Sequence, residues 1–180
     1  MVAKINGWAR VFGGIMGPKL WLVLFMNPSM PISETNLSST ATDVGPETAP
    51  RESINTIIGS MAQEGSGLVH ETAEGTLWKF HYATVDVYVQ LTGETDEDFL
   101  TVWAPVFSLP VRRQAQLLER LLSLNWSETL ETCFALLKEQ VVVMHQRTVA
   151  DLSPGEISRS ITLVATIAAE NQQKLLQEFD

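Results

Sequence analysis

The sequence predicts an α+β domain in which helices pack on one face of an antiparallel sheet. Apolar residues alternate with a period of two between residues 77 and 91, which is typical of half-buried strands. They recur at helical spacing in three other segments. The predicted order is helix, three strands, helix, two strands, helix, and short turns between successive strands favour antiparallel pairing. The predicted domain covers residues 51–180, a length that suffices for one hydrophobic core.

The first helix is predicted from Pro50 to Gln63. Proline suits the first turn of a helix, and Glu52 lies near the positive end of the helix dipole. One apolar stripe at i, i+3, i+4 and i+7 predicts the buried face: Ile54, Ile57, Ile58 and Met61. Glycines at 65 and 67 are expected to end the helix.

Three strands are predicted to follow this helix. Two alternating runs cover residues 77–82 and 85–91, and the break at Ala83-Thr84 predicts either a tight turn or a bulge. The third strand runs from Phe99 to Phe107. Because Pro105 cannot donate to a strand ladder, we expect this stretch to lie at an edge or at a bulge.

The second helix is predicted from Pro110 to Leu124, with a broad buried face. One apolar stripe is widened by further leucines, and together they comprise Val111, Ala115, Leu118 and Leu122 with Leu117, Leu121 and Leu124. Two more strands are predicted at residues 132–137 and 141–149, on either side of a polar turn.

The last helix is predicted to start at Ser153. The sequence Ser153-Pro154-Gly155-Glu156 is a capping box, in which the serine hydroxyl and the glutamate carboxylate each accept from a backbone amide of the other residue. Proline follows the cap at the first helical position. Apolar residues continue one side for over five turns: Ile157, Ile161, Val164, Ala168, Leu175 and Phe179.

Charge and composition exclude several classes of function. The net charge is −9, from 12 basic and 21 acidic residues, and all of the excess lies after residue 52. An acidic domain disfavours nucleic acids and anionic membrane surfaces, so we expect a protein partner. The single cysteine, Cys133, excludes a disulfide framework and a multi-cysteine zinc site. Because apolar residues surround it on a predicted strand, we expect Cys133 to be a buried, inert thiol. We expect a cytoplasmic, non-enzymatic protein without a cofactor or a metal.

Residues 1–50 form a separate extension in this interpretation, apolar at first and then rich in serine, threonine and proline. Residues 1–26 allow three interpretations. They could be a secretory signal, an interfacial membrane anchor that uses Trp8, Phe12, Trp21 and Phe25, or an extension read from too early a start, with Met26 or Met30 as the alternative initiator.

The candidate contact residues lie on the third predicted strand and the second helix. Aromatic residues on neighbouring strands indicate either core packing or a partly exposed sheet face that receives a peptide or a second subunit. Our candidates for partner binding are Trp103, Val106, Phe107, Leu117 and Leu121. The alternative is an enzyme or a metal-binding protein whose site forms around His81 and His145. The acidic turn at residues 94–98 fails the EF-hand pattern.

Four stretches together resemble the YbjN-domain family: Leu121-Leu122-Ser123-Leu124-Asn125, Cys133-Phe134-Ala135-Leu136, Val141-Val142-Val143, and Asp151-Leu152-Ser153-Pro154-Gly155-Glu156-Ile157. The resemblance covers roughly residues 51–180 and rests on apolar positions and one helix cap. It implies a fold similar to type III secretion chaperones, which are small acidic homodimers that bind extended segments of client proteins. It therefore implies a homodimer with a chaperone-like or adaptor role.

Deletion of residues 1–48 is expected to leave the fold and its thermal stability nearly unchanged, because no apolar periodicity precedes Pro50. We expect the melting temperature in a calorimetric scan to change by less than about 4 °C, which corresponds to roughly 1 kcal/mol for a domain of this size. A larger decrease would show that an aromatic residue of the extension, such as Trp8 or Trp21, stabilises the domain.

Overall fold

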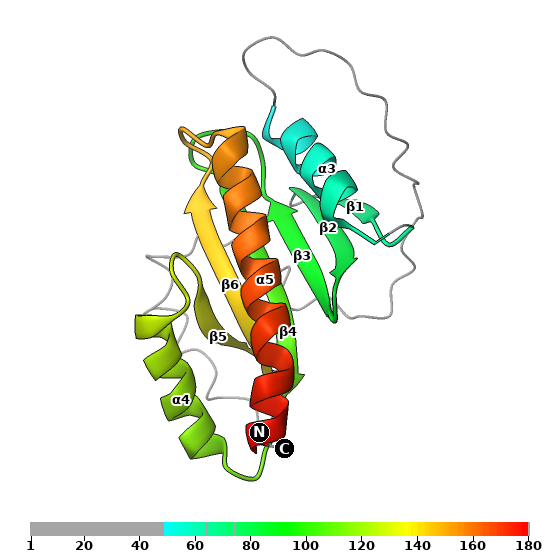
Figure 1. Cartoon of the computed structure of the whole chain (residues 1–180). Coiled ribbons are helices and arrows are strands. Elements are labelled where there is room, and N and C mark those ends of the chain that lie inside the picture. The colour runs from blue at the N-terminus through cyan, green and yellow to red at the C-terminus, as the bar shows by residue number, and fades with distance from the viewer. Residues whose placement is uncertain (1–48, 64, 74, 180) are drawn as a thin grey trace, which may run out of the picture. The chain divides into compact units, whose positions relative to one another are not determined.

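The computed structural model describes residues 49–179, except residues 64 and 74. The extension expected at residues 1–48 lies outside this range, as do the three interpretations of residues 1–26. The described elements follow one another in the order α3 (Pro50–Met61), β1 (Leu68–Thr72), β2 (Gly75–Tyr82), β3 (Val85–Leu91), β4 (Phe99–Ser108), α4 (Gln114–Ser127), β5 (Cys133–Leu137), β6 (Gln140–Thr148) and α5 (Pro154–Phe179). Figure 1 shows these elements along the chain.

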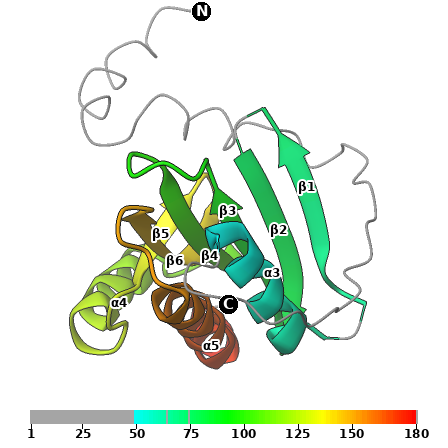
Figure 2. The same cartoon turned by 90° about the horizontal axis from the view of Figure 1, so that it is seen from above.

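The strands form one six-stranded sheet in the order β1-β2-β3-β4-β6-β5, and every neighbouring pair is antiparallel. Figure 2 shows α3, α4 and α5 on the same side of this sheet. The predicted α+β class with helices on one face is therefore confirmed. The predicted order holds as well, except that four strands rather than three precede α4.

The strand that the sequence pattern missed is β1. It pairs with β2 from Leu68↔Lys79 to Thr72↔Gly75 and forms one edge of the sheet. Its five residues are only half-buried or exposed, and its sequence LVHET alternates weakly. A short edge strand has one neighbour rather than two, so its pairing requires little apolar surface, and its sequence carries little signal.

Pro105 lies at a bulge, as one of the two predicted alternatives stated. The pairing of β4 with β6 shifts by one residue between Pro105 and Phe107. The strand β4 as a whole lies between β3 and β6. Its pairing with β3 covers only Leu100 to Trp103, whereas Pro105 is paired with Val142 of β6. At Pro105 the strand therefore has a neighbour on one side only, so this stretch is also a local edge, where proline is tolerated. Residues 83–84 form the tight turn between β2 and β3.

The hydrophobic core lies between the sheet and the helices. The helix α5 packs on β3, β4 and β6 and also against α3. Its Ile157, Ile161 and Val164 are fully buried. The largest buried side chains of the sheet are Trp78 and Phe80 on β2, and the indole N–H of Trp78 donates to Asn55 Oδ1 of α3 at 2.7 Å. Each fully buried side chain of this size contributes about 1.5–3 kcal/mol.

The helix α4 differs from its prediction. It begins at Gln114 and ends at Ser127, four and three residues later than expected. Its buried residues are Leu117, Leu121 and Leu124, whereas Leu122 is 71% exposed. The predicted broad buried face is therefore wrong. The helix packs beside β5, at the end of the sheet, so it buries only a narrow stripe.

The predicted capping box caps the N-terminus of α5. The amide of Glu156 donates to Ser153 Oγ at 3.3 Å, and the amide of Ser153 donates to Glu156 Oε2 at 2.9 Å. Arg147 of β6 donates from Nη1 to Glu156 Oε1 at 2.5 Å. The hydrogen bonds from Ser153 and Arg147 lower the pKa of Glu156 from 4.5 to about 2. The cap thus links α5 to the sheet electrostatically.

Two substitutions in α5 test its docking. Ser153→Ala removes one cap and should lower the free energy of unfolding by roughly 1 kcal/mol. Ile161→Ala leaves a cavity beneath a fully buried position and should lower it by about 2–5 kcal/mol. Urea denaturation measures both, and Ser158→Ala, which removes a hydroxyl from the helix interior, is the control. Equal and negligible losses for Ser153→Ala and Ile161→Ala would contradict the docking of α5.

The cap also predicts a pH dependence of stability. The pKa of Glu156 is about 2 in the folded chain and near 4.5 when unperturbed, so its contribution is present above pH 4.5 and is lost as the pH falls toward 2. The difference in unfolding free energy between the wild type and Glu156→Gln should therefore shrink across that interval. Glu178→Gln, at the other end of α5, controls for the loss of one charge. A difference that stays constant with pH would contradict the cap.

Candidate functional site

The face of the sheet opposite the three described helices is the first candidate surface. One row of paired residues crosses all six strands on this face: Leu68, Lys79, Tyr88, Trp103, Met144 and Cys133. Their neighbours along the strands, such as Trp78 and Val102, belong to the core beneath the helices. Because side chains alternate along a strand, the row points away from the helices. We call this row, together with Pro105 and Val142, the helix-free face, because α3, α4 and α5, the helices of the described residues, all lie on the other side.

The centre of the helix-free face is an aromatic pair. The rings of Tyr88 and Trp103 stack with their centroids 5.3 Å apart and their planes 9° from parallel. The ammonium group of Lys79 lies 5.5 Å from the centroid of the Tyr88 ring. Both aromatic side chains remain half-buried, so the pair offers a large, rigid surface with polar tips at the middle of the sheet.

A small charged group borders the aromatic pair. Lys79 Nζ lies 2.8 Å from Asp86 Oδ2, and His81 Nδ1 lies 3.1 Å from Asp86 Oδ1. Burial alone would raise the pKa of Asp86, but the hydrogen bonds from Lys79 and His81 outweigh it and lower that pKa. The same hydrogen bond raises the pKa of Lys79. The ammonium group of Lys79 therefore stays charged over the Tyr88 ring.

The other side of the pair is apolar. Three apolar residues are paired across β4, β6 and β5, next to Met144 and Cys133: Pro105, Val142 and Ala135. Cys133 was expected to be a buried, inert thiol. The residue is exposed, so the expected burial is wrong. Partial desolvation raises the pKa of its thiol, which disfavours the nucleophilic thiolate. Val142 is buried at 2% exposure, so the half-buried Pro105, Ala135 and Met144 are the side chains of this half that an apolar segment could contact.

The five predicted contact residues do not form one surface. Trp103 lies in the helix-free face, and Phe107 is half-buried against the core on the other side of the sheet. Val106, Leu117 and Leu121 are buried within that core, and none is more than 5% exposed. Part of the Trp103 side chain remains accessible, because the residue is half-buried. Contact of a partner with any of the five residues stays a prediction.

The two histidines of the alternative site lie on opposite faces of the sheet. His81 is paired with Asp86 on the helix-free side, whereas His145 is paired with the core residue Val102 and bonds through Nδ1 to the carbonyl of Glu131 at 2.7 Å. They therefore cannot share a site, and the prediction that they meet is wrong. Within residues 49–179 as described, no group of three metal-ligating side chains is close enough to hold a metal ion.

Hydrogen bonds to Asp98 stabilise the acidic turn at residues 94–98 from within. Asp98 accepts hydrogen bonds from the Thr92 hydroxyl at 3.0 Å and from the amide and hydroxyl of Thr95 at 3.0 and 2.6 Å. Gly93 allows this approach, because a Cβ there would lie 2.4 Å from the Asp98 carboxylate. The carboxylate of Asp98 is therefore used to shape the turn.

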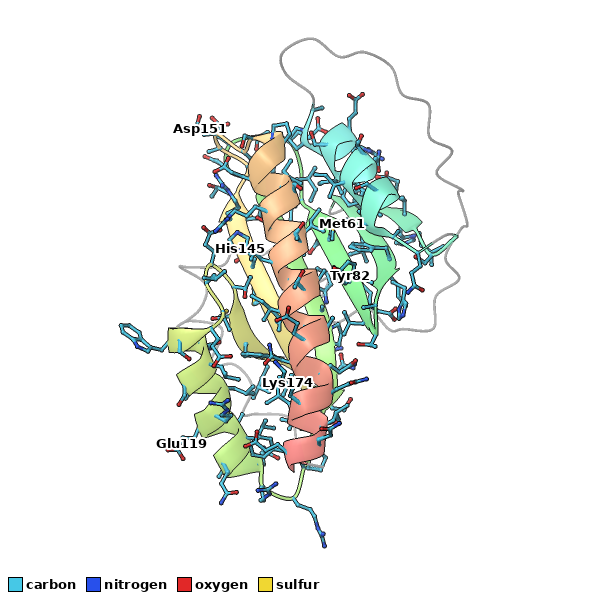
Figure 3. The ribbon with its side chains drawn as sticks, viewed as in Figure 1. Met61, Tyr82, Glu119, His145, Asp151 and Lys174 are labelled. Atoms are coloured by element: carbon cyan, nitrogen blue, oxygen red, sulfur yellow. The ribbon has the colours of Figure 1, made fainter. Side chains whose placement is uncertain are left out.

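A second candidate surface lies on α4 and β5, and sequence reasoning missed it. Its members are exposed large apolar side chains: Leu122 at 71%, Trp126 at 94%, Leu130 at 72% and Leu136 at 50%. We call this group the α4 surface. The available signal was the i, i+4 spacing of Leu122 and Trp126, outside the stripe of Leu117, Leu121 and Leu124. Figure 3 shows Glu119 on the side of α4 that faces away from α5.

Comparisons with known proteins agree with this fold. The sequence model of the YbjN family, described as "Putative bacterial sensory transduction regulator", matches residues 53–177. A chain in the crystal structure of the ExsC-ExsE complex is similar to this one, with a TM-score of 0.51 and 19% identity over 69% of this chain and 91% of that chain. At this identity the likeness concerns the fold alone. No curated protein matches the sequence.

Proposed function

The chain belongs to the YbjN family, and on that basis we propose that it is a chaperone-like or regulatory protein-binding module that acts as a homodimer and catalyses no reaction. The similar fold occurs in a solved complex of two proteins, ExsC and ExsE, which supports a role in protein binding.

The observation that carries this proposal is the stacked Tyr88–Trp103 pair in the middle of the helix-free face. A half-buried tryptophan that is held rigid by a neighbouring ring loses little conformational freedom when a partner covers it. Such aromatic anchors dominate the energy of many protein interfaces. The apolar side chains of Pro105 and Met144 extend the surface, so an extended segment can lie across several strands.

The charge of the chain narrows the class of partner. With a net charge of −9, the protein repels polyanions at neutral pH, which disfavours DNA and RNA. A neutral or basic protein segment meets no such barrier. We therefore propose a protein client and not a nucleic acid.

The two alternative functions lack comparable support. The enzyme or metal-binding alternative depended on His81 and His145, which lie on opposite faces of the sheet. The membrane-tethered alternative depends on residues 1–26, outside the described range. Among the described residues, none of the helices combines the length and apolarity needed to span a bilayer. We propose the cytoplasm as the compartment, where a single unpaired cysteine stays reduced.

Replacement of Trp103 tests the proposed surface. We expect Trp103→Ala to abolish or strongly reduce capture of a protein partner by the immobilised full chain, because it removes the anchor. The melting temperature should fall only modestly, since the side chain is half-buried and lies on the face opposite the helices of the described domain. Trp103→Phe, which keeps a ring that can stack on Tyr88, should retain most of the capture.

The outcomes separate the two interpretations of Trp103. A steep loss of stability with unchanged capture would show that Trp103 is a packing residue, and it would contradict the proposed surface. Turnover of a substrate by the purified chain would contradict the non-enzymatic role.

A further inference from the structure

The helix-free face continues from the aromatic pair toward the acidic turn between β3 and β4. Gln90 follows Tyr88 by two residues on β3. It is paired with Thr101, which precedes Trp103 by two residues on β4. Because side chains two residues apart point to the same face of a sheet, Gln90 and Thr101 lie on the helix-free side, as does Phe99 at the start of β4. We call Gln90, Thr101 and Phe99 the turn end of the helix-free face.

Gln90 is a buried polar side chain without a partner. It is only 4% exposed, although the three described helices all lie on the other side of the sheet. Its neighbours bond to each other, because Gln146 Nε2 donates to Thr101 Oγ1 at 2.9 Å. The carboxamide of Gln90 forms no hydrogen bond with any described residue. Since most buried polar groups in proteins are hydrogen-bonded, this carboxamide indicates a ligand that supplies the missing partner.

The adjacent acidic turn carries charge that the described domain does not neutralise. Glu94, Asp96 and Glu97 are exposed and form no ion pair with the part of the chain that the structure describes. The fourth carboxylate, that of Asp98, accepts hydrogen bonds within the turn. In a chain with a net charge of −9, three exposed carboxylates beside an aromatic surface attract a basic group. A segment bound at the turn end therefore carries a lysine or an arginine.

A segment on the face of a sheet receives no hydrogen bonds from a strand ladder. Tyr88 and Trp103 are paired with each other, and each also has a second neighbouring strand on its other side. An N–H group of the segment that turned toward this face would lose water without gaining a backbone acceptor. Proline has no N–H, and a polyproline II segment leaves its carbonyl groups open to donors. The donors at this site are the indole N–H of Trp103 and the carboxamide of Gln90, and neither donates to a described residue.

The apolar part of the helix-free face is narrow. On the opposite face, α5 buries side chains along its length, from Ile157 to Phe179. The apolar surface around Trp103 is instead bounded by the Lys79–Asp86 ion pair on one side and by the buried Gln90 on another. An amphipathic helix needs a longer and wider apolar strip than this. A single extended chain fits it better.

We propose that the helix-free face binds a proline-rich segment of a partner protein in the polyproline II conformation. Prolines of the segment pack on Trp103 and on the neighbouring Met144 and Pro105. Carbonyl groups of the segment accept hydrogen bonds from Trp103 Nε1 and from Gln90, and a lysine or arginine of the segment lies at the acidic turn. This inference rests on the proposed protein-binding function and names the class of segment that is bound. Aromatic side chains with exposed donors are a recurrent way of binding such segments.

The sheet also sets the spacing within the segment. Thr92, just after β3, follows Tyr88 by four residues, which is roughly 13 Å at the rise of a strand. The exposed carboxylates begin two residues later, at Glu94. A polyproline II segment rises about 3.1 Å per residue. The basic residue therefore lies about four to six residues from the proline that packs on Trp103.

Fluorescence anisotropy of labelled peptides, titrated with the full chain, tests the class of segment. The probes contain about eight prolines with two arginines at the C-terminal end, or the same residues with the arginines at the N-terminal end. One control replaces the prolines by alternating glycine and serine, and the other replaces the arginines by glutamates. We expect at least one probe to bind with a Kd below about 1 mM, and its controls to bind about tenfold more weakly or not at all. Equal binding of the proline and glycine–serine peptides would overturn the proposal.

Substitutions on the face test where the probe binds. Trp103→Ala should weaken binding of the probe by about tenfold or more. Gln90→Leu should weaken it by about threefold or more, while the melting temperature stays the same or rises, because an unpaired buried carboxamide is replaced by an apolar group. Gln173→Leu, at an exposed position of α5, should leave binding unchanged. A lower melting temperature with unchanged binding in Gln90→Leu would show that the carboxamide serves the fold, and it would overturn its role in binding.

Neutralisation of the acidic turn tests the basic position of the segment. The triple variant Glu94→Gln, Asp96→Asn, Glu97→Gln should weaken binding of the proline–arginine probe at low salt by about threefold or more. A matched triple variant removes three exposed carboxylates elsewhere: Glu139→Gln, Glu170→Gln, Glu178→Gln. Equal weakening by both triple variants would show an effect of net charge alone, and it would overturn the contact at the turn.

The results distinguish the failure of this inference from the failure of the proposed function. Suppose that Trp103→Ala abolishes capture of a protein partner, but the proline probes bind no better than their controls. The helix-free face then binds protein, and the polyproline assignment is overturned. If neither capture nor probe binding changes in Trp103→Ala, the proposed surface and this inference are both overturned.

Discussion

The fold depends on the burial of α5 along the middle of a sheet whose three described helices all lie on one side. Its Ile157, Ile161 and Val164 pack on the central strands, and the Ser153–Glu156 cap fixes where the helix begins. Arg147 joins that cap to β6. The core is formed by the apolar side chains of the face that α5 covers. The exposed parts of the opposite face can therefore contact another protein.

The two candidate surfaces follow from this one-sided arrangement in different ways. The helix-free face is the reverse side of the strands that α5 covers, and Trp103 and Tyr88 stack there between core residues of the same strands. The α4 surface exists because α4 sits at the end of the sheet beside β5, where it can bury only one narrow side. One surface is broad, rigid and part of the sheet, and the other is a single helix with its following turn.

The sequence predicted what depends on strong periodicity or on local chemistry. The alternation around Trp78 and Val87, the helix of Ile54 and Ile58, and the cap at Ser153 were all recognisable from neighbouring residues. It did not predict β1, whose five residues bury little, nor which leucines of α4 face the core. Leu121 and Leu122 are adjacent and chemically identical, and only the position of α4 beside β5 decides that the first is buried and the second exposed. Trp103 was named as a candidate contact residue and is half-buried in the structure, but its stacking on Tyr88 required the register of β3 and β4.

Site-specific photocross-linking from position 103 is the most direct measurement of the central claim, that the helix-free face binds protein. A photoreactive amino acid in place of Trp103, in the full chain expressed in cells, is predicted to form a covalent adduct with a second protein. The same amino acid at Gln173, on the exposed side of α5, should form none. Adducts of equal yield from both positions, or none from position 103, would contradict the account.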